Sequence, residues 1–209
     1  MKIRMYPALF TGFLFSFFVY ANGQTVDAVT TITWPHDTPD DPVATYSENT
    51  GDYFKPDYVS LGSNLNYLRV RESNGETFRT YQPNSQTGSG PDNVIGFHIW
   101  PVTGLSFTPT HVSFKAQRYG TDSGLLDVKW KSSDGTGVVI ATALKPARDN
   151  SGSFTSADYD LSGLTIPASD GECALQIILY DLGNTKEVGL ADIVLTGTIS
   201  GTIIQVTTY

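Results

Sequence analysis

The sequence predicts an all-β protein, folded as an antiparallel β-sandwich or jelly roll. About nine segments alternate apolar and polar residues with a period of two, at the spacing expected of a sandwich. Gly, Asp and Asn separate these segments, and no window of about eleven residues repeats with the 3.6-residue period of a helix. The 209 residues are enough for one such domain with its own core.

The clearest alternation lies between Phe107 and Ala143. The first apolar set is Val112, Phe114 and Ala116, and the second is Leu126, Val128 and Trp130. A turn at Gly120–Gly124 separates the two sets, and a turn at Asp134–Gly137 leads into a third segment, Val138–Ala141. We therefore expect a three-stranded meander with one buried face, which places Trp130 in the core.

Further strands are expected on both sides of this meander. The candidates are Thr25–Trp34, Leu61–Glu72, Thr77–Tyr81, Val94–Trp100, Asp158–Leu164, Cys173–Tyr180 and Val188–Ser200. Asn74-Gly75 is a two-residue hairpin signal that joins the second and third candidates. The polar residues from Pro83 to Asn93 predict a surface loop, a kind of segment that often carries binding function.

The first 23 residues have the features of a secretory signal peptide. Lys2 and Arg4 precede the apolar run Ala8–Tyr20, and the small residues Ala21–Gly23 offer a cleavage site. The run is shorter than the roughly 20 residues that span a bilayer, which disfavours the rival interpretation as a membrane anchor. We therefore divide the chain into a signal peptide (1–23), a β-sandwich domain (24–201), and a segment (202–209) that is either a final strand or the start of a linker. The protein is expected to be secreted, to the extracellular space or the periplasm, with no membrane span after cleavage.

Composition and cysteine usage disfavour several functional classes. Asp and Glu number 21 against 13 Lys and Arg, a net charge of −8, whereas a nucleic-acid partner calls for a basic surface. Cys173 is the single cysteine, so no disulfide can form within the chain, and its parity with Leu175 predicts a buried thiol. The three histidines lack the spacing of a zinc site, and no cofactor is predicted.

The usual catalytic motifs are absent, so no catalytic residue is predicted. The chain has no G-x-S-x-G, no H-E-x-x-H, no Walker loop and no G-x-G-x-x-G after a strand. One enzymatic alternative stays open. Leu68–Glu72, Phe97–Ile99 and Phe114–Tyr119 are faintly similar to the motifs of jelly-roll polysaccharide lyases, which use Arg, His or Gln, and Tyr on a concave sheet. The chain lacks the Gln before the His and the Gly-x-Tyr-x-Gln of those enzymes.

A binding surface is predicted from the outward faces of the strands. Its members are Arg69, Arg71, Trp100, Lys115, Gln117, Tyr119, Lys129 and Lys131. If these strands are neighbours, their side chains form a locally positive patch with aromatic rings on an acidic protein. Sugars stack on aromatic rings and bond to polar donors, and a carboxylated sugar also pairs with Arg or Lys. Outward Lys and Arg on strands, however, more often serve solubility and edge protection.

Several segments resemble the non-catalytic N-terminal β-sandwich modules of secreted bacterial pectate lyases and related polysaccharide-degrading enzymes. They are Gly104–Thr110, Arg118–Asp122, Lys145–Arg148, Leu182–Lys186 and Ala191–Thr198. The resemblance covers about Val94 to Gly201 and implies a jelly roll similar to galactose-binding-like carbohydrate-binding modules. Such modules often hold a structural Ca²⁺ away from the sugar, but no ligand spacing here identifies such a site.

These observations favour a secreted, non-catalytic module that binds plant cell-wall polysaccharide, including an anionic glycan such as pectin. It would keep a fused or partner polysaccharide-degrading enzyme close to its substrate. The alternatives are a small jelly-roll polysaccharide lyase, and a structural or adhesive surface module.

Overall fold

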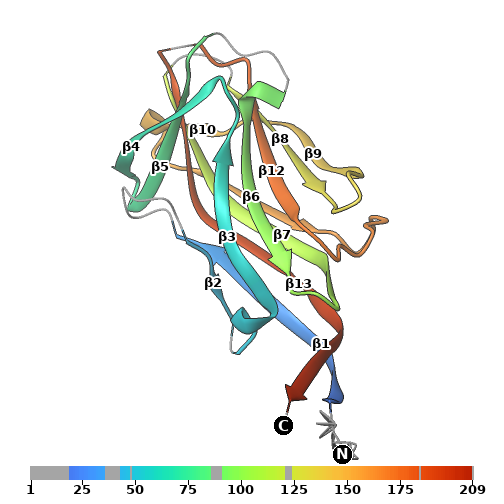
Figure 1. Cartoon of the computed structure of the whole chain (residues 1–209). Helices are drawn as coiled ribbons and strands as arrows, with labels where there is room; N and C mark the ends of the chain where they lie inside the picture. Colours follow the sequence, from blue (N-terminus) through green and yellow to red (C-terminus); the bar gives the residue numbers. More distant parts are fainter. Residues whose placement is uncertain are drawn as a thin grey trace, which may run out of the picture.

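The computed structural model describes residues 19–35, 43–47, 49–85, 91–120, 124–183 and 185–208. Within these ranges the chain is almost entirely β, with three single-turn 3₁₀ helices, η1 (Gly51–Tyr53), η2 (Pro91–Asn93) and η3 (Asp149–Ser151). Two sheets pack face to face (Figure 1), so the predicted all-β sandwich with a jelly-roll-like architecture is confirmed.

Among the described residues, eight strands form the larger sheet and five form the smaller one. The large sheet contains β1 (Val19–Trp34), β2 (Thr45–Tyr46), β4 (Leu65–Ser73), β5 (Glu76–Pro83), β7 (Leu105–Tyr119), β10 (Ala147–Arg148), β11 (Thr155–Asp160) and β13 (Glu187–Thr208). The small sheet contains, in spatial order, β3 (Phe54–Leu61), β6 (Val94–Pro101), β12 (Cys173–Tyr180), β8 (Leu125–Lys131) and β9 (Gly137–Leu144). Pairing is antiparallel throughout the described strands except between β10 and β7.

The core lies between the two sheets and is rich in aromatic rings. The Trp34 ring centroid lies 5.5 Å from that of Phe97, and the Phe107 centroid lies 6.0 Å from that of Trp130. All four residues are fully buried. Each pair joins one ring from the large sheet to one from the small sheet, so these contacts hold the sandwich together. The prediction that Trp130 belongs to the core is confirmed.

The predicted meander between Phe107 and Ala143 is wrong in its first connection. Strand β7 pairs with β13, β11 and β10 in the large sheet, whereas β8 pairs with β12 and β9 in the small sheet. The chain therefore crosses from one sheet to the other after Tyr119, through a turn of which residues 121–123 lie outside the described residues. Both strands still turn their apolar residues toward the same core, which is why their alternation looks continuous.

The β4–β5 hairpin turns at Asn74-Gly75, as predicted. Their φ angles are 53° and 78°, the two left-handed conformations that a type I′ turn requires. The tip of the loop predicted between Pro83 and Asn93, residues 86–90, lies outside the described residues.

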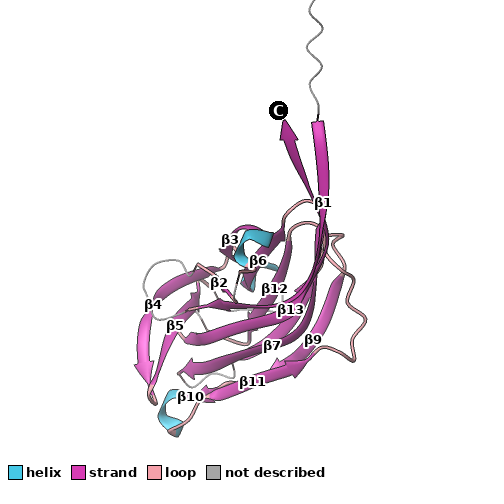
Figure 2. Ribbon diagram, turned by 90° about the horizontal axis from the view of Figure 1, so that it is seen from below, coloured by secondary structure: helices cyan, strands magenta, loops and turns pink. Residues whose placement is uncertain are grey.

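The two ends of the described chain run side by side. Strand β1 pairs with β13 along its whole length, and the two extend together beyond the sandwich (Figure 2). Residues 202–208 are thus part of a strand. Strand β1 begins at Val19, inside the predicted signal peptide, while residues 1–18 lie outside the described residues, so cleavage near Gly23 stays a prediction. No helix in the described ranges is long and apolar enough to cross a membrane.

Candidate functional site

Five of the eight predicted binding residues gather on the outer face of the large sheet, where their side chains are either paired with carboxylates or buried. Arg69 Nη2 and Arg71 Nη2 lie 2.7 Å and 2.8 Å from the same Glu187 oxygen, and Arg71 Nε donates to the other oxygen at 2.9 Å. The Arg71 guanidinium carbon lies 4.7 Å from the ring centroid of Tyr119, which is only 7% exposed.

The other two members of this group, Lys115 and Gln117, also bond to groups within the protein. Lys115 Nζ lies 2.5 Å from a Glu76 oxygen and 2.8 Å from an Asp192 oxygen. Gln117 is fully buried and donates to the Ser153 carbonyl at 3.1 Å. The cations of Arg69, Arg71 and Lys115 are paired with carboxylates, and Gln117 and Tyr119 are buried, so no ring or amide of this group is presented to a sugar.

The remaining three predicted residues, Trp100, Lys129 and Lys131, lie on the outer face of the small sheet. The predicted patch is therefore divided between the two outer surfaces of the sandwich, because β7 and β8 are not neighbours. Trp100 is 38% exposed, and Lys55 Nζ lies 3.9 Å from its ring centroid. Of the predicted set, this aromatic ring has the exposure that sugar stacking needs.

A series of hydrogen-bonded polar side chains, not predicted from the sequence, crosses the same outer face. Ser60 Oγ lies 2.7 Å from His98 Nε2, and His98 Nδ1 lies 2.8 Å from Glu172 Oε1. The Tyr58 hydroxyl donates to that same Glu172 oxygen, and the Tyr58 ring stacks on the imidazole at 4.2 Å between centroids. We call Tyr58, Ser60, His98 and Glu172 the His98 cluster.

Three elements position the His98 cluster. Tyr58 and Ser60 lie two residues apart on β3, and Tyr58 is the register partner of His98 on β6. Glu172 immediately precedes β12, whose residue Ala174 is the register partner of both His98 and Lys131. Because successive side chains alternate across a strand, these residues share one face of the sheet.

Hydrogen bonding and burial shift the pKa values of the cluster. The hydrogen bond to Glu172 raises the pKa of Tyr58 to about 12, so the phenol stays a donor, and that bond and His98 keep the pKa of Glu172 below its usual value. Burial lowers the pKa of His98, the charge of Lys131 acts in the same direction, and Glu172 opposes both. A neutral imidazole beside a carboxylate carries its proton on Nδ1, which leaves the Nε2 lone pair to accept the Ser60 hydroxyl proton.

Gly96 provides the space in which the serine and the histidine meet. A Cβ atom at this position would lie 2.7 Å from both His98 Nε2 and Ser60 Oγ. Gly96 is the register partner of Ser60 and lies two residues before His98 on β6. A glycine within a strand usually marks a close approach, and here the approach is between these two side chains.

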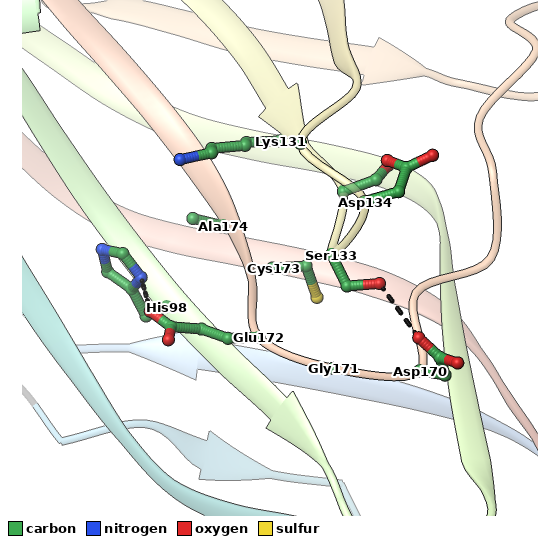
Figure 3. Close-up of a pocket in the computed structure, with 11 residues that line it drawn as sticks. His98, Lys131, Ser133, Asp134, Asp170, Gly171, Glu172, Cys173 and Ala174 are labelled. Atoms are coloured by element: carbon green, nitrogen blue, oxygen red, sulfur yellow. Dashed lines mark hydrogen bonds and ion pairs between the residues drawn. The ribbon is translucent and has the colours of Figure 1, made fainter.

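A pocket of about 580 Å³ adjoins the cluster (Figure 3). Its walls are the turn after β8, residues 132–135, and the segment before β12, residues 170–172, with His98 and Lys131 at one side. Ser133 Oγ donates to Asp170 across the opposite side at 3.2 Å. The lining is mostly polar and carries both signs of charge, as suits a hydroxyl-rich ligand better than an apolar one.

The lyase arrangement considered from the sequence is not formed. His98 lies on the small sheet, whereas Arg69, Arg71 and Tyr119 lie on the large one, so these residues do not line one cleft. Within the described residues, no group of three or more His, Cys, Asp or Glu side chains could hold a metal ion.

Comparisons with known proteins supply no family. No protein-family description and no curated protein matches the sequence. Among solved structures, the chain is distantly similar to particles of infectious bursal disease virus. A VP2 subviral particle is 11% identical over 91% of this chain and 62% of that chain, with a TM-score of 0.40. The virus-derived T=1 particle is 11% identical over 90% and 60%, with a TM-score of 0.38. This chain thus spans about three fifths of those proteins, and likenesses this distant carry no argument about function.

Proposed function

We propose that this protein is a secreted carbohydrate-binding protein and that its sugar site is the outer face of the small sheet. The observation that carries the proposal is an exposed tryptophan, Trp100, on the same face as the polar pocket beside His98 and Lys131. Trp100 lies two residues beyond His98 on β6, about 7 Å along the strand. A sugar ring stacked on the indole would therefore reach the donors at the pocket mouth.

The charge around this site favours an anionic or mixed-polarity glycan. Lys55 lies over the Trp100 ring, Lys131 is exposed at the pocket, and Lys129 lies on the same strand face. Among the described residues, these three lysines share the face with the carboxylates of Asp134, Asp170 and Glu172. A uronate-containing polysaccharide such as pectin would pair its carboxylates with the lysines and its hydroxyls with the acidic side chains. Binding of this kind would hold a fused or partner enzyme near plant cell-wall material.

Replacing Trp100 by alanine tests the site. We expect Trp100→Ala to weaken glycan binding at least tenfold, about 1.4 kcal/mol, because the stacking surface is lost. Affinity electrophoresis through gels containing pectin, xylan or β-glucan measures the effect as a loss of retardation. The matched control is Arg69→Ala, a change to an exposed residue on the opposite sheet, which should leave retardation unchanged.

Two outcomes would contradict the proposal. If the Arg69→Ala variant lost its retardation and the Trp100→Ala variant kept it, the glycan-binding site would be on the large sheet. An absence of retardation of the wild-type protein in every gel would favour the structural or adhesive alternative.

A further inference from the structure

We propose that Ser60, His98 and Glu172 form a nucleophile–base–carboxylate triad that cleaves esters by acyl transfer. This activity goes beyond sugar binding and does not depend on it. It also departs from the expectation of a chain without catalytic residues, which was based on sequence motifs alone. A triad is defined by geometry and roles and not by sequence position, since it recurs on unrelated folds in different chain orders.

The hydrogen bonds around His98 have the order that a triad requires. The nucleophile must contact one imidazole nitrogen and the carboxylate must contact the other, and here Ser60 meets Nε2 at 2.7 Å while Glu172 meets Nδ1 at 2.8 Å. Tyr58 stacks on the ring and also bonds to Glu172, so the base and its carboxylate are held from a second direction. A histidine that merely filled a polar surface would not need this double restraint.

Gly96 is buried beneath the serine and the histidine. A side chain there would displace both reacting groups, since its Cβ would lie 2.7 Å from each. The His98 side chain is 18% exposed, and Ser60 is half-buried, so the reacting atoms are sheltered but can still be reached from solvent.

A donor for the developing oxyanion is available next to the nucleophile. Gly62 N donates to Val94 O at 2.7 Å, so in the same antiparallel register Ser60 also bonds to its partner on β6. The intervening N–H of Leu61 therefore points to the opposite side, where β3 is the edge of the small sheet among the described strands. An N–H immediately after the nucleophile is a common oxyanion donor.

The reaction balances without a cofactor. Ser60 Oγ attacks the ester carbonyl carbon while its proton passes to His98 Nε2. The tetrahedral intermediate then collapses, the carbon–oxygen bond to the alcohol breaks, and the leaving oxygen takes the proton from His98. Water repeats the sequence on the acylated serine, releasing the carboxylic acid and restoring Ser60. The open sheet face suits a short acyl group on a large alcohol, such as an O-acetyl ester of a polysaccharide.

Ser60 and His98 are the catalytic residues in this proposal, and Glu172 is a positioning residue. Glu172→Gln should keep the fold but weaken stabilisation of the protonated imidazole. We expect at least a tenfold slower reaction and a shift to lower pH of the midpoint at which the rate rises with pH, because the histidine loses its anionic partner. A purely structural role for Glu172 would leave that midpoint in place.

The decisive experiment uses the full chain and two small probes, a fluorophosphonate and p-nitrophenyl acetate. We expect peptide mass mapping of the unmodified protein to find the phosphonyl adduct on Ser60. Ser60→Ala and His98→Ala should each hydrolyse the ester at least tenfold more slowly. The matched control is His111→Ala, since His111 is exposed and pairs with Asp158 on the other sheet. It should retain the full rate.

A pair of glycine variants tests the geometry separately. Gly96→Ala should lower the ester rate at least tenfold, whereas Gly137→Ala, at a strand glycine with open space around it, should not. The proposal is overturned if the wild-type protein carries no adduct on Ser60, or if Ser60→Ala hydrolyses the ester at the wild-type rate. Neither probe contains sugar, so these results do not depend on whether any glycan is bound.

Discussion

The Gly197→Ala variant is expected to lose roughly 3 kcal/mol of stability, because there is no room for a methyl group in the core at this position. A Cβ on Gly197 would lie 2.4 Å and 2.5 Å from two ring carbons of Phe107 and 2.5 Å from the Thr108 carbonyl oxygen. Phe107 is fully buried and its ring packs against Trp130, so neither the ring nor the backbone can move freely. For a domain of this size the loss corresponds to a Tm about 6–12 °C lower.

Thermal and urea unfolding measure this effect, and Gly137→Ala is the matched control. Gly137 begins β9, and a Cβ there would meet nothing within 4 Å, so that substitution should change stability by less than about 0.5 kcal/mol. The double variant Gly197→Ala with Phe107→Leu should be less destabilised than the sum of its parts, since the smaller residue relieves the overlap. A Gly197→Ala protein as stable as wild type would contradict the packing described around Phe107.

The Glu187→Gln variant is expected to lose about 2–3 kcal/mol at pH 7. Glu187 is 7% exposed and receives two arginines, and removing one partner of a buried ion pair typically costs about 3–5 kcal/mol. The lower figure applies because the Arg69 and Arg71 side chains are 54% and 32% exposed and can regain water. Glu72→Gln, at an exposed site on the neighbouring hairpin, is the control and should be nearly neutral.

The cost of Glu187→Gln should also depend on pH. Burial alone would raise the pKa of Glu187, but hydrogen bonds from Arg71, Arg69 and Thr80 outweigh it and the pKa is lowered from 4.5. The ionised carboxylate therefore contributes stability that is complete above about pH 4.5 and is lost as the pH falls through the lower folded value. Urea unfolding at several pH values should show the two proteins converging on acidification. A constant difference would mean that the carboxylate charge is not what stabilises this face.

The sequence predicts where the strands of this protein lie better than it predicts which strands pair with one another. Alternation depends on burial of one face, so Trp130 and Cys173 are placed correctly from local pattern alone. The turn after Tyr119 marks where a strand ends, but turn residues carry no information on which sheet the next strand joins. For this reason Lys115 and Lys129 were expected on one surface although they lie on opposite ones.

The His98 cluster was missed for a related reason. Ser60 and Glu172 lie 38 and 74 residues from His98 in the sequence, and only the pairing of β3, β6 and β12 brings them together. A weak signal existed, since His98 and Trp100 share the outward parity of β6 and glutamates are scarce in the chain. Neither observation identifies the strands that lie beside β6, so Ser60 and Glu172 could not be predicted to contact His98.

The single cysteine, Cys173, has a practical consequence for measurements on this protein. The residue is 2% exposed, and burial raises the pKa of its thiol to about 12, so the native protein holds almost no thiolate. An alkylating reagent such as iodoacetamide should therefore modify the chain only when the sandwich opens. The rate of labelling at Cys173 therefore measures how often the sandwich opens, without an engineered probe. The same burial prevents a disulfide from forming between two copies of the protein in air.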